Sequence, residues 1–251
     1  MPHAKPLNRL TLCEPYRSRG RLLRALLKTV SIALLVAPFG CVSSLAQSLS
    51  PQEELFNRPA AVSPRASKSV LLSISNAGNR LVAVGEAGYV VLSDDDGRTW
   101  RQAKVPSSVA LTKVYFSTES VGWAVGHGGV VLHTEDGGNT WAKQLDGLQL
   151  IQIEQKGAES ELDSNSRVAR LEEVRRLAMD GADKPLFDVY FGNDGRGYVV
   201  GAYGLAFFSP DGGKSWTSLR GRIPNPKGKH LYAIHVSGAD VFVAGEQGAV
   251  Y

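Results

Sequence analysis

Cysteine is almost absent from this sequence. The 251 residues include two cysteines, Cys13 and Cys41, and both lie within the first 46 residues. Residues 47–251 therefore have no disulfide, no thiolate nucleophile and no cysteine-based metal site. This is compatible with an oxidising compartment but does not by itself indicate one.

Long apolar runs are also scarce. The apolar stretch at residues 29–42 is shorter than the roughly 20 residues that a membrane-spanning helix needs. It follows a basic stretch at residues 17–28 and precedes Ser44, Leu45 and Ala46, which suit a signal peptidase cutting before Gln47. Residues 1–46 are therefore predicted to be a signal peptide, and an uncleaved anchor stays open. We expect an exported protein, periplasmic or otherwise extracytoplasmic, or membrane-associated.

The positive charge of the chain is concentrated in this leader. The formal net charge is +4, but residues 1–46 carry seven basic residues and one acidic residue, which leaves 21 basic and 23 acidic residues for the rest. The remainder is slightly acidic, so nothing in it indicates nucleic acid as a partner.

One eight-residue pattern occurs three times: hydroxyl residue, any, Asp, any, Gly, any, hydroxyl residue, Trp. Each copy follows a short apolar run that is typical of a β-strand. Asp can accept backbone N–H bonds and Gly tolerates positive φ, so the pattern predicts a hairpin turn that satisfies its own polar groups. A structural role is favoured over a catalytic one, and the run Asp94 to Asp96 lacks the spacing of a calcium loop. The defining residues are Ser93, Asp95, Gly97, Thr99, Trp100; Thr134, Asp136, Gly138, Thr140, Trp141; and Ser209, Asp211, Gly213, Ser215, Trp216.

A second repeated feature is a strand followed by a Gly-x-x-Gly corner. The corners begin at Gly85, Gly126, Gly201 and Gly245. Intervals of roughly 40–45 residues with four strands per unit are typical of propeller blades, and the longer interval after Gly126 indicates an insertion. We predict a linker at 47–66, one propeller domain at 67–251 and an insertion at 146–185. The fourth unit lacks its eight-residue pattern, so we expect a propeller that is incomplete at the C-terminus.

The middle of the insertion predicts a helix over residues 166–180. Val168, Leu171, Val174 and Ala178 form an apolar stripe at helical spacing. Glu172 and Arg176 have the spacing of an i,i+4 ion pair. The pattern favours a helix packed on its own domain over a helix that binds a partner.

The eight-residue pattern resembles the Asp-box of sialidase-type β-propellers. Together with the corners and the segments 183–191 and 200–205, it resembles the photosystem II stability and assembly factor family, including relatives in bacteria without photosystems, over residues 69–251. This resemblance implies an all-β, seven-bladed propeller, here with about four blades and a helical insertion. It implies a non-catalytic scaffold that helps a membrane protein complex, photosystem-like or a transporter, to assemble or function. No cofactor and no small-molecule substrate is indicated.

The alternative is a sialidase-like glycoside hydrolase or a carbohydrate-binding propeller. Sialidase chemistry needs an arginine cluster, a Tyr–Glu nucleophile pair and an acid. The arginines here fall in hairpins, in the insertion and after the third box, and Arg222-Ile223-Pro224 occurs late. No catalytic residue and no metal site is predicted.

The alternation of strands predicts a working face. In an up-and-down blade the corners and the links between blades lie opposite the Asp-boxes. Glu86, His127, Tyr203 and Glu246 are therefore expected to share a face with the insertion helix. We predict that a client protein docks on this face.

Overall fold

The chain divides into residues 1–46 and 47–251. The structure is a computed structural model that describes Glu54 and residues 56–251, so the leader predicted at 1–46 lies outside the described residues. Everything below concerns the second unit.

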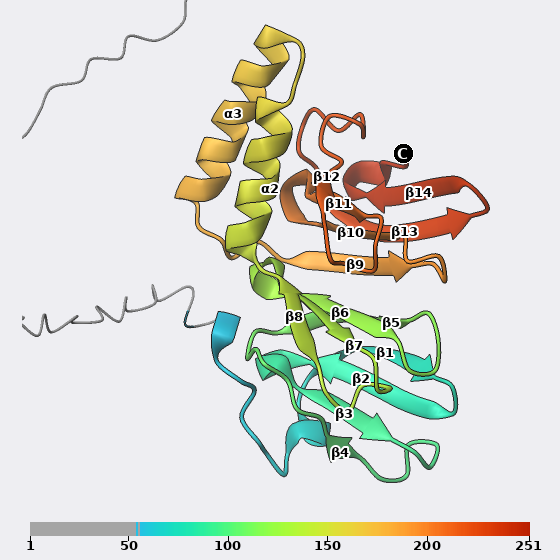
Figure 1. The fold of residues 1–251 in the computed structure, drawn as a ribbon. Helices are drawn as coiled ribbons and strands as arrows, with labels where there is room; N and C mark the ends of the chain where they lie inside the picture. The colour runs from blue at the N-terminus through green and yellow to red at the C-terminus, as the bar shows by residue number, and fades with distance from the viewer. Residues whose placement is uncertain (1–53, 55) are drawn as a thin grey trace, which may run out of the picture. The chain divides into compact units, whose positions relative to one another are not determined.

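Three four-stranded antiparallel sheets and one two-stranded sheet follow one another along the described chain (Figure 1). In each sheet the strands lie side by side in chain order, which is the up-and-down arrangement of a propeller blade. The predicted all-β class with propeller blades is confirmed. The strands are β1 (Leu71–Ala77), β2 (Arg80–Gly85), β3 (Val90–Ser93) and β4 (Arg101–Gln102) in the first blade; β5 (Leu111–Phe116), β6 (Gly122–Gly126), β7 (Val131–Thr134) and β8 (Ala142–Leu145) in the second; β9 (Leu186–Phe191), β10 (Gly197–Gly201), β11 (Ala206–Ser209) and β12 (Thr217–Ser218) in the third; and β13 (Leu231–Ser237) and β14 (Asp240–Gly245) in the fourth.

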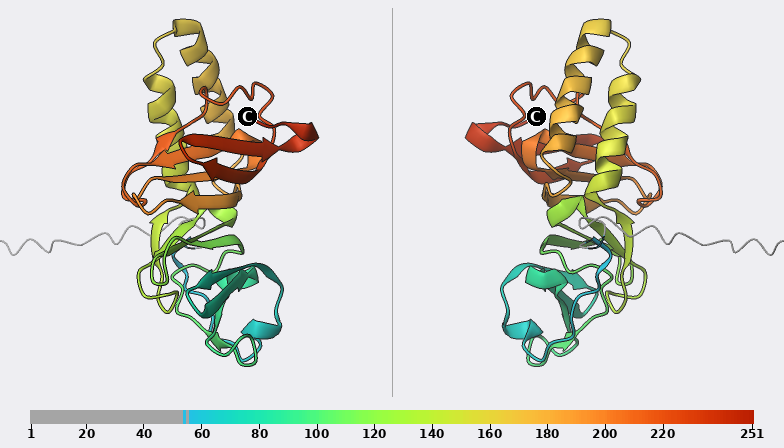
Figure 2. Two further views of the ribbon diagram at one scale, coloured as in Figure 1. Left: turned by 90° about the vertical axis from the view of Figure 1, so that its right-hand side faces the viewer. Right: turned by 90° about the vertical axis from the view of Figure 1, so that its left-hand side faces the viewer.

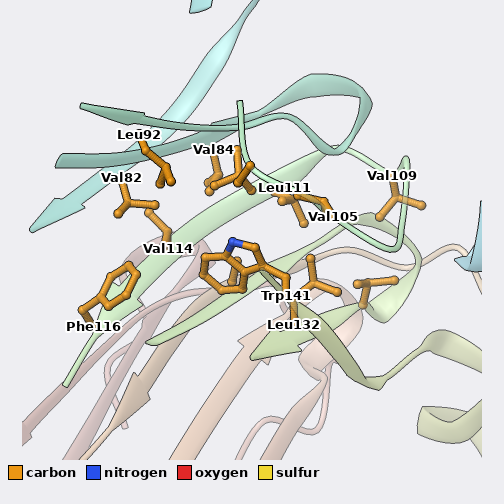
Figure 3. Close-up of a cluster of buried hydrophobic side chains, with 14 of the residues drawn as sticks. Val82, Val84, Leu92, Val105, Val109, Leu111, Val114, Phe116, Leu132 and Trp141 are labelled. Carbon is orange, nitrogen blue, oxygen red and sulfur yellow. The ribbon is translucent and has the colours of Figure 1, made fainter. Parts of the chain in front are cut away.

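The hydrophobic core lies between neighbouring blades. Figure 3 shows Val82, Val84 and Leu92 of the first blade facing Val114 and Trp141 of the second. β6 is buried along its whole length because the second blade is covered on both faces. This double covering explains why the strands read as continuous apolar runs rather than as an alternating pattern.

The second and third blades meet through aromatic rings. The ring centroids of Trp123 and Phe191 lie 3.8 Å apart with the planes at 8°. Trp216 packs edge-on against Phe191 with a centroid distance of 5.9 Å. The fourth blade adds Leu231 and Val243 to a smaller cluster with Val200.

The described part of the predicted linker packs on the first two blades. Phe56 is buried in the core cluster between them. The Ala60 N–H donates to the Val105 carbonyl (3.1 Å) and the Ser63 N–H donates to Gln102 Oε1 (2.9 Å). Residues 56–66 therefore belong to the folded unit, whereas the composition of this stretch predicted a linker.

The insertion is a hairpin of two helices, α2 (Gly147–Glu159) and α3 (Ser164–Met179), which stand side by side in Figure 2. Within the described residues, neither helix combines the length and apolarity needed to cross a membrane. The predicted helix corresponds to α3, but α2 was not predicted. Its sequence does carry a signal, because Asp146 and Gln149 form a capping box ahead of apolar residues.

Two predicted details of α3 are wrong. Val168 and Ala178 are exposed, and the face toward the protein instead carries Arg170, Leu171, Val174 and Leu177. The helix is therefore rotated relative to the predicted stripe, because the buried side must also accommodate an arginine.

The predicted ion pair also has a different partner. The Glu172 carboxylate pairs with Arg175 (2.6 Å), three residues away, rather than with Arg176.

Candidate functional site

Each Asp-box is a turn closed by its own side chains. The Asp95 carboxylate accepts hydrogen bonds from Ser93 Oγ (2.8 Å), Thr99 N (2.8 Å) and Thr99 Oγ1 (2.6 Å). Ser93 Oγ in turn accepts from the Gly97 N–H (2.8 Å), and Trp100 Nε1 donates to the Gly97 carbonyl (3.0 Å). The same five bonds recur at 2.6–3.0 Å in the boxes that begin at Thr134 and Ser209.

The box carboxylates are held as ionised acceptors. Hydrogen bonds from Thr99 and then Ser93 lower the pKa of Asp95. Hydrogen bonds from Ser215 and then Ser209 lower the pKa of Asp211 in the same way. A carboxylate whose charged form is already hydrogen-bonded is a poor proton donor, which favours a structural role for the boxes.

The corners at the other end of each blade are closed by the backbone. In all four, the N–H of the first glycine donates to the carbonyl four residues later at 2.8–3.1 Å. The N–H of the second residue donates at 2.9–3.0 Å to the carbonyl of the residue that precedes the first strand of the blade. The third residue has positive φ of 54–64°, and it is Ala87, Gly128, Tyr203 or Gln247.

Glu86 and Glu246, predicted for the working face, have the same intramolecular role. Glu86 Oε1 accepts a hydrogen bond from the Val70 N–H (3.0 Å) and Glu246 Oε2 accepts one from the His230 N–H (2.9 Å). Each carboxylate thus secures the start of the first strand of its own blade. One carboxylate oxygen of each residue is therefore already used in a hydrogen bond within the protein.

His127 occupies the same corner position in the second blade and lies beside the helical hairpin. The next two residues, Gly128 and Gly129, are buried. A Cβ on Gly128 would come within 2.3 Å of Phe56, and one on Gly129 within 2.4 Å of Leu150 in α2. The hairpin and Phe56 therefore cover most of this corner and leave the His127 side chain exposed.

Tyr203, in the third blade, lies beside α3. It is 51% exposed, in a left-handed conformation with φ of 54°. Its N–H donates to His230 Nδ1 (2.8 Å) and its carbonyl accepts from Arg220 Nη2 (2.7 Å). Lys184 Nζ, which also donates to the carbonyls of Asp180 and Gly181 just after α3, lies 5.7 Å from the centre of the Tyr203 ring. The positive φ is shared by the third residue of all four corners and belongs to the turn, and only in the third blade does this position carry an aromatic side chain.

Tyr203 and α3 line one groove, which we call the Tyr203 groove. Its volume is about 340 Å³. Arg176 and Lys227 have no side-chain partner within the described part of the chain, so the groove carries free positive charge. Its walls are Glu173, Arg176, Leu177 and Asp180 of α3 with Lys184, Tyr203, Arg220 and residues 226–228.

Figure 1 shows the hairpin on the same side as the corners that follow β2, β6, β10 and β14. Of the four residues predicted for that face, the structure places Tyr203 on a groove with α3 and His127 beside α2. Glu86 and Glu246 are held against their own blades. The structure thus brings two of the four residues next to the hairpin.

Glu154 of α2 was missed by the sequence reasoning, and it anchors the hairpin. It is fully buried. Its carboxylate accepts from Ser218 Oγ (2.9 Å) and lies 3.4 Å from Arg220 Nε and 3.5 Å from Arg170 Nη2. Burial raises the pKa of Glu154, against the lowering effect of Arg220, Ser218 and Arg170. This network ties both helices to the outer strand of the third blade.

Asp188, another residue that was not predicted, links three blades at the inner strands. It lies in β9 and is 7% exposed. Its carboxylate accepts from the Ile234 N–H of the fourth blade (2.8 Å) and pairs with Lys113 Nζ of the second blade (3.3 Å). Such a buried, doubly bound carboxylate serves packing between blades.

Among Glu54 and residues 56–251, no three His, Cys, Asp or Glu side chains are grouped as metal ligands would be. Burial lowers the pKa of His133, and its ring packs against Trp123 at 5.0 Å. His133 is therefore a packed histidine within the second blade.

Comparison with known proteins finds a family model that matches part of the chain. Residues 68–150 match the family model described as "Photosynthesis system II assembly factor YCF48". No curated protein sequence matches the chain.

Several solved structures resemble the chain at low sequence identity. YCF48 bound to a D1 peptide is 18% identical, with 71% of this chain and 48% of that chain covered and a TM-score of 0.46. YCF48 from Cyanidioschyzon merolae is 18% identical, with 72% and 50% covered and a TM-score of 0.47. The GH74 enzyme of Niastella koreensis is 17% identical, with 78% and 27% covered and a TM-score of 0.42.

The chain spans about half the length of the two YCF48 structures. Its resemblance to the photosystem II assembly factor family is confirmed over residues 68–150, the segment that contains the first two Asp-boxes.

Proposed function

We propose that this protein is a non-catalytic, extracytoplasmic scaffold that assists the assembly or function of a membrane protein complex. The observation that carries the proposal is the family match over residues 68–150. A protein of that name is described as bound to a D1 peptide, which supports a membrane protein as the kind of client. The leader at residues 1–46 supports export.

The side chains support binding better than catalysis. The box aspartates are hydrogen-bonded within their turns, and Glu86 and Glu246 accept backbone N–H groups. Glu154 is buried and paired with two arginines. A glycoside hydrolase needs two carboxyl groups flanking an accessible cleft, and these carboxylates are otherwise engaged.

We place client docking at the Tyr203 groove. Exposed aromatic side chains and arginines are enriched at protein interfaces, and the groove offers Tyr203 beside the unpaired Arg176. Hydrogen bonds at its N–H and its carbonyl fix the main chain of Tyr203, so little backbone entropy is lost there on binding.

The test is site-specific photo-crosslinking in the native host. A photoreactive amino acid replaces Tyr203 in one variant and Lys214, an exposed Asp-box residue, in the matched control. We expect adducts with one integral membrane protein from position 203 alone, and loss of those adducts on adding Arg176→Glu. Equal adducts from both positions, or none with a membrane protein, would overturn the proposal.

Export is tested separately. Mass spectrometry of the mature protein should find an N-terminus at or near Gln47. A cytosolic protein that retains Met1 would contradict the extracytoplasmic role.

A further inference from the structure

A second and larger cleft adjoins the Tyr203 groove, and Arg220 belongs to the walls of both. It lies between the last turns of α2, the loop that joins α2 to α3, and the segment that follows β12. Its volume is about 600 Å³, which is within the range of about 300–1,000 Å³ typical of ligand sites. Trp216, at the end of the third box, is the one Asp-box residue in the walls of this cleft. The walls contain no residue of the Gly-x-x-Gly corners.

The cleft has an excess of positive charge. Lys156, Arg170, Arg220 and Arg222 line it, against a single carboxylate, Glu161. Arg170 and Arg220 are paired from behind by the buried Glu154. The exposed side chains of Lys156 and Arg222 have no partner within residues 56–251, which leaves two free cations at its rim.

Arg170 also has an unused donor. Its Nε is buried and has no hydrogen-bond acceptor in the described part of the chain. A buried N–H without an acceptor is uncommon, because leaving it unpaired costs roughly 1–3 kcal/mol. Because this atom is closed to solvent, a ligand in the cleft reaches it only if the Arg170 side chain moves.

Apolar side chains stand beside these cations. Leu162, in the loop between the helices, is 96% exposed. Ile153 and Trp216 are half-buried in the same wall, and Trp216 already uses its indole N–H within the Asp-box. What remains of Trp216 for a ligand is its apolar ring.

We propose that this cleft binds an acidic peptide segment in which carboxylates alternate with apolar side chains. The carboxylates pair with Lys156 and Arg222, and an apolar side chain packs between Leu162 and Trp216. Nucleic acid would satisfy the cations but not the aliphatic wall. This site goes beyond the proposed function, because it shares neither Tyr203 nor Arg176 with the docking groove.

The test uses a fluorescein-labelled octapeptide of alternating Glu and Leu, with fluorescence anisotropy as the measurement on the full chain. We expect saturable binding to the parent protein, and at least tenfold weaker binding to the double variant Lys156→Glu, Arg222→Glu. The matched control is Arg98→Glu, Lys104→Glu on the first blade, where both side chains are exposed and unpaired among the described residues. This control should bind as the parent does.

Three further probes separate the alternatives. An octapeptide of alternating Gln and Leu should bind at least tenfold more weakly, and one of alternating Lys and Leu should not bind. Displacement of the labelled peptide by equimolar acetate or phosphate would show a small-anion site and overturn the peptide proposal. Absence of saturation by the Glu–Leu peptide, or equal losses in the two double variants, would also overturn it.

Among the described residues, neither the Lys156 nor the Arg222 side chain makes a hydrogen bond or an ion pair, so thermal melts of the double variant should match those of the parent. Crosslinking from position 203 should persist in this variant. Arg220, the wall residue common to both sites, is unchanged in this variant, so the cleft and the docking groove are tested separately.

Discussion

The two ends of each blade close their turns by different means. At the Asp-box end, side chains close the turn, and the five hydrogen bonds of the first box recur in the second and third. At the corner end, backbone groups close the turn, and the third position carries a different residue in each blade, while the second is Glu in two blades and His or Ala in the others. A turn made by side chains constrains its sequence, whereas a turn made by the backbone leaves side chains available for binding.

The helical hairpin, which is the insertion in this propeller, lies at the end of the blades where the backbone closes the turns. The helical hairpin joins the second and third blades on the corner side (Figure 1). There α2 covers Gly129, the neighbour of the exposed His127, and α3 lines the groove with Tyr203. Function is therefore expected to vary at the corners and stability to depend on the boxes and on the corner glycines.

The largest loss of stability is expected from a substitution of the glycine that begins a Gly-x-x-Gly corner, such as Gly126 in the second blade. A Cβ on Gly126 would lie 2.2 Å from the Ala110 carbonyl oxygen and 2.8 Å from the Leu111 Cα, and both are backbone atoms that cannot move aside. Gly126→Ala should cost more than about 4 kcal/mol of unfolding free energy, a size that few single changes reach. Urea unfolding measures this loss.

The control for this glycine is Gly212→Ala in the third Asp-box. Gly212 has φ of +75° but no atom within 4 Å of the added Cβ, so strain alone should cost about 1–2 kcal/mol. Equal losses in the two variants would show that close backbone approach does not define the corner.

The second effect concerns the anchor of the hairpin. Glu154→Ala leaves Arg170 and Arg220 without their buried partner, and breaking such a pair costs about 3 kcal/mol. Hydrogen–deuterium exchange should speed up across residues 147–179 and stay unchanged in the three Asp-boxes. Uniformly faster exchange in the blades would mean that the hairpin supports the whole fold rather than the corner side alone.

The third effect tests the boxes. Asp136→Ala removes the acceptor for Thr134 Oγ1, Thr140 N and Thr140 Oγ1, and we expect a loss of about 1–2 kcal/mol because the carboxylate is partly solvated. Thermal melts measure the loss. Glu135→Ala, the neighbouring exposed carboxylate, is the matched control and should melt with the parent. An unchanged melting temperature for Asp136→Ala would remove the structural role of the box.

These expectations show which parts of the fold the sequence predicts. The boxes and corners are local: their residues are within eight positions of one another, so the pattern alone locates the turns and the strands beside them. The helix α3 was also predicted, because apolar residues at helical spacing are a local signal. The prediction of which side of α3 faces the protein was wrong. Arg170 faces inward toward Glu154, a partner 16 residues away that no local pattern reveals.

The candidate site was predicted less well for the same reason. Tyr203 was selected as a corner side chain, but its groove depends on α3, Lys184 and residues 226–228, which meet only in the folded chain. Glu86 and Glu246 were selected by the same rule, yet each finds a backbone N–H 16 residues away. Position in a repeat predicts the face and not the bonds that a side chain makes there.

The fourth effect is a dependence of stability on pH. Its sign is opposite for the Asp-box carboxylates and for Glu154, which anchors the hairpin. The pKa of Asp95 and Asp211 is lowered in the folded protein, so the stability they add is present above their unfolded value of about 4 and is lost as pH falls through the folded value. The pKa of Glu154 is raised by burial, so its contribution declines as pH rises from the unfolded value toward the folded one.

Acid should therefore weaken the boxes before it weakens the hairpin anchor. Three of the four tryptophans, Trp100, Trp141 and Trp216, belong to boxes, so tryptophan fluorescence reports the box end. The melting temperature followed by tryptophan fluorescence should fall as pH is lowered from 5 to about 3. In Asp95→Asn this fall should be smaller. A parent melting temperature that rises over this range would contradict the assignment.

The smallest effect is expected at the third corner position, which is occupied by Ala87, Gly128, Tyr203 and Gln247 with nearly the same φ. For Ala87→Gly, relief of left-handed strain favours the folded state, while the extra freedom of glycine favours the unfolded state by about 0.5–1 kcal/mol. The two terms nearly cancel, so the unfolding free energy should change by less than about 0.5 kcal/mol. Ala87→Gln, which copies the fourth blade, should be equally mild, since Ala87 is exposed. A loss above about 1 kcal/mol in either variant would mean that the corner constrains its side chains as tightly as the box does, and the corner face would then have little freedom to vary for binding.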